Sequence, residues 1–167
     1  MPVAIRCKAF LVSVFMVWAG GWAHADEFPF FAKPNRDHVR VRTDSTTQSL
    51  ILGELKTEAV VNVISEKWDW FQIRLPSEFP GYVHSAFVRT TPDKGSIISA
   101  DHVNIRAHPS REAPILGQVK RNTPVHVMGT QGDWVSIQAL PTFTAYVHSR
   151  LVTPVHPREI LREGATP

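Results

Sequence analysis

The sequence repeats itself at a fixed offset of 64 residues. The tetrapeptide YVHS occurs at 82–85 and again at 146–149, and residues 38–88 align with 102–152 without a gap. In this alignment HVRVR meets HVNIR, ILGELK meets ILGQVK, and DWFQI meets DWVSI. A fixed period of this kind indicates duplicated structural units. The chain is therefore expected to contain two copies of one small domain.

Each copy shows the apolar and polar alternation of β-strands. The segments VRVR and VNIR, AVVNVISE and PVHVMGT, and WFQIRL and WVSIQA follow this pattern, with turn signals between them. Five short strands in about 60 residues favour a small, strongly bent barrel over a flat sheet. We therefore expect an all-β protein with two tandem barrels, at 26–90 and 91–155, and a C-terminal tail at 156–167.

The first 25 residues have the layout of a secretory signal peptide. Arg6 and Lys8 precede an apolar run at 9–17, and a small-residue site at 23–25 follows it. This run is shorter than the roughly 20 residues that a membrane-spanning helix needs. The pattern predicts cleavage before Asp26, no stable membrane insertion afterwards, and a mature protein that is periplasmic or secreted.

Charge and cysteine content exclude several classes of function. The full chain has 18 basic and 15 acidic residues, and removal of the leader would take away Arg6 and Lys8 and leave the mature chain nearly neutral. A nucleic-acid partner is not expected, because such proteins carry a basic surface. Cys7, the only cysteine, lies in the leader. The mature chain is therefore expected to have no disulfide, no thiol nucleophile and no thiolate metal ligand.

The order of the segments resembles a known family. The second copy reads VNIRAHPS, ILGQV, VHVMGTQGDWVSI and AYVHSRL, and the first copy follows the same order with VRVRTDSTTQS, ILGEL, VNVISEKWDWFQI and GYVHSAF. This pattern resembles tandem bacterial SH3-like domains over nearly all of the mature chain, with Tyr82 and Tyr146 in place of the family's closing Trp. The resemblance implies two SH3-like barrels with a ligand-facing Trp at the start of the DW strand.

Strand alternation places this Trp on a polar face. In the first copy Phe71 and Ile73 share the apolar face, whereas Trp70 shares the other face with Gln72. Trp134 has the equivalent position in the second copy. An aromatic side chain on such a face can form a shallow groove for an extended peptide or a sugar. The alternative is that each indole covers the edge of the core or packs against the neighbouring domain.

The candidate ligand-binding residues are therefore aromatic. They are Trp68, Trp70, Tyr82, Trp134 and Tyr146. Trp68 has Gly132 as its counterpart in a hairpin loop, where a core role is hard to supply. For this reason the first copy is expected to contribute more to binding than the second.

Histidines and arginines recur at equivalent positions and are given structural roles. His84 and His148 lie where the last strand turns, without the spacing of a metal site. The serines that follow them are expected to cap the next turn. Arg42 and Arg106 can pair with a carboxylate or brace the loops that follow them. No metal and no cofactor are expected.

The chain shows no motif of an enzyme. No serine lies in a G-x-S-x-G elbow, and a barrel of about 60 residues has little room for a catalytic cleft. Two functions remain. The first is a non-catalytic exported module that recognises cell-envelope material, namely peptidoglycan or its peptides. The alternative is a periplasmic adaptor that binds another exported protein through the same aromatic face.

Overall fold

The structure is a computed structural model that describes residues 28–93 and 95–158. The leader expected at 1–25 and most of the tail expected at 156–167 lie outside the described residues. Within the described part, no helix is long and apolar enough to cross a membrane. The fold is all-β, as the alternation predicts.

Each repeat forms seven strands and one short 3-10 helix rather than the five strands expected. The first repeat forms β1 (Phe30–Pro34), β2 (Val39–Arg42), β3 (Ile51–Leu55), β4 (Val61–Lys67), β5 (Trp70–Arg74), β6 (Pro80–His84), η1 (Ser85–Phe87) and β7 (Val88–Thr91). The second forms β8 (Gly95–Ile98), β9 (Val103–Arg106), β10 (Ile115–Val119), β11 (Val127–Gln131), β12 (Trp134–Gln138), β13 (Thr144–His148), η2 (Ser149–Leu151) and β14 (Val152–Val155). The extra strands open and close each repeat.

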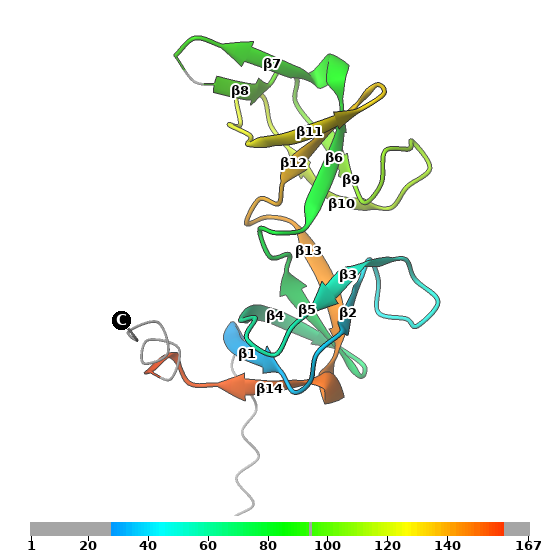
Figure 1. Cartoon of the computed structure of the whole chain (residues 1–167), viewed down its shortest axis with the longest axis vertical. Helices are drawn as coiled ribbons and strands as arrows, with labels where there is room; N and C mark the ends of the chain where they lie inside the picture. The colour runs from blue at the N-terminus through cyan, green and yellow to red at the C-terminus, as the bar shows by residue number, and fades with distance from the viewer. Residues whose placement is uncertain (1–27, 94, 159–167) are drawn as a thin grey trace, which may run out of the picture.

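The sheets do not follow the repeat boundaries. One sheet has the order β14-β1-β4-β5-β13-β2-β3 and is called barrel 1. A second sheet, β10-β9-β6-β12-β11, and the hairpin β7-β8 form barrel 2. In Figure 1 the orange β13 lies among the strands of the first repeat, and the green β6 lies among those of the second. The two repeats have exchanged their final strands.

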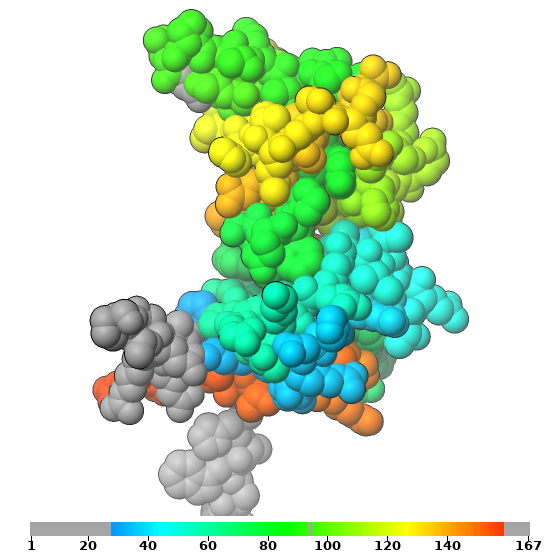
Figure 2. Space-filling view, in the orientation of Figure 1, coloured from blue at the N-terminus to red at the C-terminus, as the bar shows by residue number. Residues whose placement is uncertain are grey.

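This exchange makes barrel 2 an insertion in barrel 1. Barrel 2 is built from the continuous stretch between β6 and β12, whereas barrel 1 combines β1–β5 with β13 and β14. The division at 90/91 therefore describes the sequence repeats and not the folded bodies. Figure 2 shows two lobes joined at a narrow waist.

The waist consists of residues 75–79 and 139–143, which connect the barrels. The N–H of Leu75 donates a hydrogen bond to the carbonyl of Phe143 at 2.9 Å. Each segment contains a proline, and the residue before a proline is sterically restricted to extended backbone. Each segment also contains a turn, closed by the bond from the N–H of Phe79 to the carbonyl of Pro76 at 3.1 Å and from that of Phe143 to the carbonyl of Leu140 at 2.9 Å.

The exchange changes which residues share a core. Val83, in β6, pairs with Val135 of barrel 2, and Val147, in β13, pairs with Phe71 of barrel 1. The sequence places Val83 in the core of the first repeat and Val147 in that of the second, and the structure shows the reverse. Most of the other expected core residues are buried in their own repeat, including Ile73, whereas Phe71 and Val127 are only partly buried.

Both ends of the described chain belong to barrel 1. Strand β1 pairs antiparallel with β14, with Phe31 opposite Val155 and Pro34 opposite Val152. The equivalent pair in barrel 2 is the hairpin β7-β8. It joins the second sheet through backbone hydrogen bonds, such as that from the N–H of Val125 to the carbonyl of Ser96 at 2.9 Å.

Candidate functional site

The strand exchange assembles one face of barrel 2 from both repeats. In β12, Val135 and Ile137 are buried, so Trp134 points to the outer side. The register places Trp134 opposite His84 of β6, and Tyr82 of the same strand opposite Arg106 of β9. An aromatic ring from one repeat therefore lies beside a histidine from the other.

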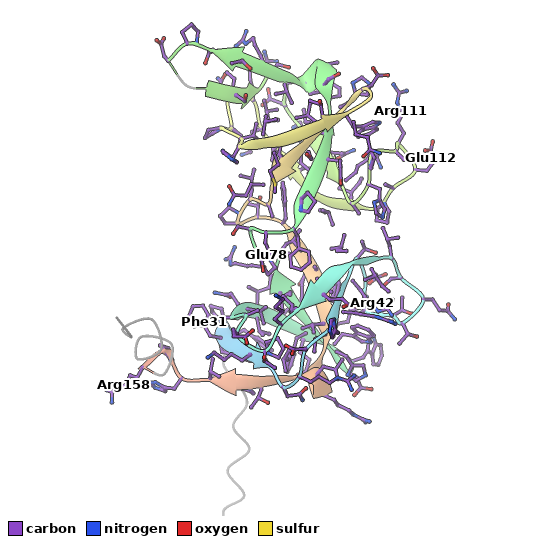
Figure 3. All side chains as sticks on the ribbon, in the orientation of Figure 1. Phe31, Arg42, Glu78, Arg111, Glu112 and Arg158 are labelled. Atoms are coloured by element: carbon purple, nitrogen blue, oxygen red, sulfur yellow. The ribbon has the colours of Figure 1, made fainter. Side chains whose placement is uncertain are left out.

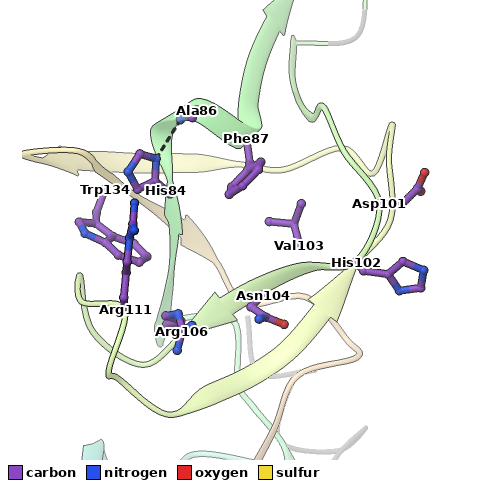
Figure 4. Close-up of a pocket in the computed structure, with 10 residues that line it drawn as sticks. All are labelled: His84, Ala86, Phe87, Asp101, His102, Val103, Asn104, Arg106, Arg111 and Trp134. Atoms are coloured by element: carbon purple, nitrogen blue, oxygen red, sulfur yellow. Dashed lines mark hydrogen bonds between the residues drawn. The ribbon is translucent and has the colours of Figure 1, made fainter.

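A cavity of about 490 Å³ lies over this face and is called groove 2 (Figure 4). Its lining includes His84 and Phe87 from the first repeat, and Val103, Arg106, Arg111 and Trp134 from the second. The ring of His84 lies 5.6 Å from that of Trp134 and 6.2 Å from that of Phe87, measured between ring centroids. Aromatic side chains and two arginines therefore line the same cavity.

His84 also begins the short helix that carries Phe87. Its Nδ1 accepts a hydrogen bond from the N–H of Ala86 at 3.3 Å (Figure 4). His148 makes the equivalent bond with Arg150 at 3.4 Å. The caps are therefore the histidines and not the serines that follow them, which corrects the expectation from the sequence. In the tautomer that this bond requires, Nε2–H is left as a donor.

Barrel 1 carries the equivalent cavity, of about 560 Å³, which is called groove 1. Trp70 lies beside His148 of the second repeat, with ring centroids 5.1 Å apart. Leu151 takes the position of Phe87, and Thr47 that of Arg111. Each groove is therefore composite, because each takes its histidine from the other repeat.

The arginines at the base of the grooves brace the loops that follow them. Arg42 is buried and donates to the carbonyl of Ser49 at 2.6 Å. Arg106 is half-buried and donates to the carbonyl of Ala113 at 2.7 Å. The bracing role expected from the sequence is confirmed at both positions. Since each of these bonds uses one terminal nitrogen, the other donors of each guanidinium remain for further partners.

The predicted site residues fall into three groups. Trp70 and Trp134 line the two grooves, but Trp70 is only 8 % exposed whereas Trp134 is half-buried. Tyr82 and Tyr146 share the face of their groove without lining the cavity itself. Their role in binding a ligand stays a prediction.

Trp68 lies apart from both grooves. It is 83 % exposed at the tip of the β4–β5 hairpin. Its φ is +58°, and the equivalent Gly132 has φ +57°. Glycine takes such a conformation freely, whereas a residue with a bulky side chain has a higher conformational energy there. The chain therefore keeps a large exposed ring at a position that suits glycine.

Sequence reasoning did not identify Phe87 and Arg111 as site residues. Phe87 lies in the short helix η1, which belongs in sequence to the first repeat. It lines groove 2 of barrel 2 only because the final strands are exchanged. Arg111 lies in the loop between β9 and β10 (Figure 3), where nothing in the pattern distinguishes it from other exposed charges.

Acidic side chains near the grooves already have partners. Asp101, at the rim of groove 2, accepts a hydrogen bond from the backbone N–H of Arg121 at 3.0 Å, which lowers the pKa of its carboxyl group. Asp37, at the equivalent rim of groove 1, is held in the same way by Thr57, and its pKa is also lowered. Among the described residues, no group of three or more potential ligands is placed to hold a metal ion.

Comparison with known proteins identifies the two sequence repeats. The family model described as bacterial SH3 domain matches residues 37–96 and again residues 101–153. Comparison with curated proteins finds no match. The two family matches cover more than half of the chain and coincide with the two repeats, so the chain belongs to the bacterial SH3 domain family.

Proposed function

We propose that the protein is an exported, non-catalytic module that binds peptidoglycan through its peptides, using grooves 1 and 2. Bacterial SH3 domains are generally non-catalytic binding modules, often for the cell wall. The export signal expected at 1–25 would deliver the chain to the compartment that contains this polymer.

The observation that carries the proposal is the recurrence of one composite site. A Trp and a His from different repeats meet at the same register in both barrels, at ring distances of 5.6 and 5.1 Å. A concave surface with an aromatic wall and a few fixed polar groups suits an extended peptide. A polymer with many identical peptides could engage both grooves at once, which would raise the overall affinity.

Replacement of Trp134 by Ala is expected to weaken binding to isolated sacculi by roughly thirtyfold, which corresponds to about 2 kcal/mol. The reason is that Trp134 is half-buried and forms a wall of groove 2. The measurement is co-sedimentation with purified sacculi. Met128→Ala is a matched control, because Met128 is exposed on the neighbouring strand β11 and does not line the groove.

Trp70→Ala should mainly reduce the stability of the fold. The sequence predicts instead that the first copy, which contains Trp70, contributes more to binding than the second. Because Trp70 is 8 % exposed, its truncation should lower the free energy of unfolding by about 3–5 kcal/mol, as seen for large buried aromatics. Thermal unfolding measured beside the binding assay separates the two effects. If the wild type fails to co-sediment with sacculi, the peptidoglycan proposal is abandoned.

The alternative function is that of an adaptor for another exported protein, and Trp68 favours it. An isolated indole that is 83 % exposed has the properties of an anchor residue at a protein interface. It lies outside both grooves. An adaptor could therefore use the β4–β5 hairpin, a surface separate from the one proposed for peptidoglycan.

Trp68→Gly is expected to leave the free energy of unfolding unchanged or to raise it by up to about 1 kcal/mol. The change relieves the cost of positive φ, about 1–2 kcal/mol for a residue other than glycine, against the extra flexibility that glycine gives the unfolded chain. Urea unfolding measures the result, with Asp69→Gly beside it as a hairpin control. A clear loss of stability would show that the ring packs in solution and would remove the argument for an anchor.

A further inference from the structure

We propose that groove 2 binds a carboxylate of an extended peptide through Arg106 and Arg111, with an apolar side chain of the same peptide against Trp134. The proposal rests on the proposed function for its source of ligand, because the peptides of peptidoglycan are short and bear carboxylates. Barrel 1 does not share this specificity.

The positive charge in groove 2 is available. Arg111 is exposed and lines the groove from the β9–β10 loop (Figures 3 and 4), where its charge acts on the neighbouring carboxylate of Glu112. Arg106 is oriented by its bond to the carbonyl of Ala113 at 2.7 Å. One fixed and one exposed guanidinium can together bind a carboxylate, since planar guanidinium groups match its two oxygens.

The carboxylates near these arginines are compensated in part by other groups. Glu112, next to Arg111, accepts a hydrogen bond from Ser110, and this bond, with the charges of Arg106 and Arg111, lowers the pKa of its carboxyl group. Among the described residues that line it, Asp101 is the one acidic side chain. Its two oxygens face Arg121, at 3.0 Å from the backbone nitrogen and 3.5 Å from Nε of that residue, which lies outside the groove. Its charge is thus compensated from the other side, and the groove keeps an excess of positive charge.

The rest of the lining combines apolar side chains, in part exposed, with the polar side chains of His84, His102 and Asn104. Phe87 is 41 % exposed beside His84 and Val103. An aromatic wall next to two guanidinium groups suits a ligand that presents an apolar group and a carboxylate on neighbouring positions. A sugar without a charge would leave the arginines without a partner and would gain less.

Groove 1 lacks the same arrangement, which makes the specificity a property of barrel 2. Thr47 stands in the position of Arg111. Glu54 lines groove 1, where it lies 2.7 Å from His38 and 3.8 Å from Arg40. A carboxylate of the protein therefore already pairs with Arg40, one of the three arginines that line groove 1 beside Arg36 and Arg42.

In barrel 2 this ionic cluster is replaced by a neutral pair. The equivalent of Glu54 is Gln118, and that of Arg40 is Asn104. The two side-chain amides bond to each other at 2.8 Å. No acidic group at that position competes with a ligand, so a carboxylate from outside is expected to bind better in groove 2 than in groove 1.

The test uses two matched peptides, acetyl-Ala-Phe-Ala with a free C-terminal carboxylate and the same peptide with a C-terminal amide. Each is titrated into the ¹⁵N-labelled protein, and the dissociation constant is read from the indole N–H of Trp134 and the amides of 84–87 and 104–111. We expect the carboxylate peptide to bind about tenfold more tightly or better. Arg111→Gln should remove most of this preference, and Arg111→Thr should make groove 2 resemble groove 1.

Arg89→Gln is the control, because it removes one positive charge from an exposed position on β7 outside the groove. It should preserve the preference for the carboxylate. Equal affinity for the two peptides, failure of either to shift these resonances, or an unchanged preference in Arg111→Gln would each overturn the proposal.

A parallel experiment separates this inference from the proposed function. Native sacculi are compared with sacculi whose carboxylates have been converted to amides. Loss of binding on amidation supports both ideas, whereas equal binding to the two preparations rejects the carboxylate site and leaves the cell-wall function intact. If the carboxylate peptide binds but no sacculi do, the site stands and its ligand becomes the carboxyl terminus of an exported protein.

Discussion

Ile73→Asp is expected to unfold barrel 1 alone, and the equivalent change Ile137→Asp is expected to unfold both barrels. Both isoleucines are fully buried, in β5 and β12. An aspartate at either position would be a charge without a partner in an apolar core, which costs more than a small domain can tolerate. The same substitution is made in both variants, so they differ only in the barrel that it disrupts.

The difference follows from the insertion. Barrel 2 is continuous in sequence, so it can persist when barrel 1 unfolds. If barrel 2 unfolds, barrel 1 must close a loop of about 70 residues between β5 and β13, at a cost of roughly 4 kcal/mol. This cost is comparable to the whole stability of a domain of about 60 residues, roughly 3–9 kcal/mol.

The measurement is the dispersion of backbone amide resonances in the two variants. In Ile73→Asp, the amide resonances of residues 80–138 should keep their native chemical shifts, whereas those of barrel 1 should collapse to the narrow range of an unfolded chain. In Ile137→Asp, both sets should collapse. If each variant lost only its own sequence repeat, with 26–90 and 91–155 behaving independently, the strand exchange would be wrong.

Gly81→Ala is the second change with a large expected effect, a loss of about 1–3 kcal/mol in the free energy of unfolding. A Cβ at Gly81 would lie 2.5 Å from Cγ2 of Ile105 and 3.3 Å from the ring of Phe143. Ile105 is fully buried, so the overlap can be relieved only by moving the core of barrel 2. The measurement is urea unfolding.

The double variant Gly81→Ala with Ile105→Ala is the control, because alanine has no Cγ2 to overlap with the new methyl group. Ile105→Ala alone should cost about 2–5 kcal/mol, because it leaves a cavity in the core of barrel 2. The loss in the double variant should be smaller than the sum of the two single losses, since the overlap is removed. A loss in the double variant equal to that sum would contradict this account of the contact.

Barrel 1 already carries a methyl group at the equivalent position. Ala145 takes the position of Gly81 there, Val41 takes that of Ile105, and both are fully buried. The core of barrel 1 therefore accommodates the methyl group that Gly81→Ala would add in barrel 2.

The sequence predicts the fold class because the period and the alternation are local patterns. It also predicts that Ile73 faces the core, and the structure confirms this. The partner of each final strand could not be predicted, since β6 and β13 share the residues YVHS.

The candidate site was predictable only in part for the same reason. Alternation places Trp70 and Trp134 on one face, but it cannot tell that His148 would cover Trp70 and leave it 8 % exposed. Groove 2 takes Phe87 from a segment that belongs in sequence to the other repeat. A composite site of this kind becomes visible only when the strands are placed in space.

The pairing of β1 with β14 determines which part of the molecule can extend outward. Both ends of the described chain leave from barrel 1, and Figure 1 shows barrel 2 at the opposite end of the long axis. A tether or fusion partner joined at either end would therefore sit next to barrel 1. Groove 2 would remain at the distal tip in both cases, so an immobilisation tag at either end should leave it equally accessible to a large, insoluble ligand.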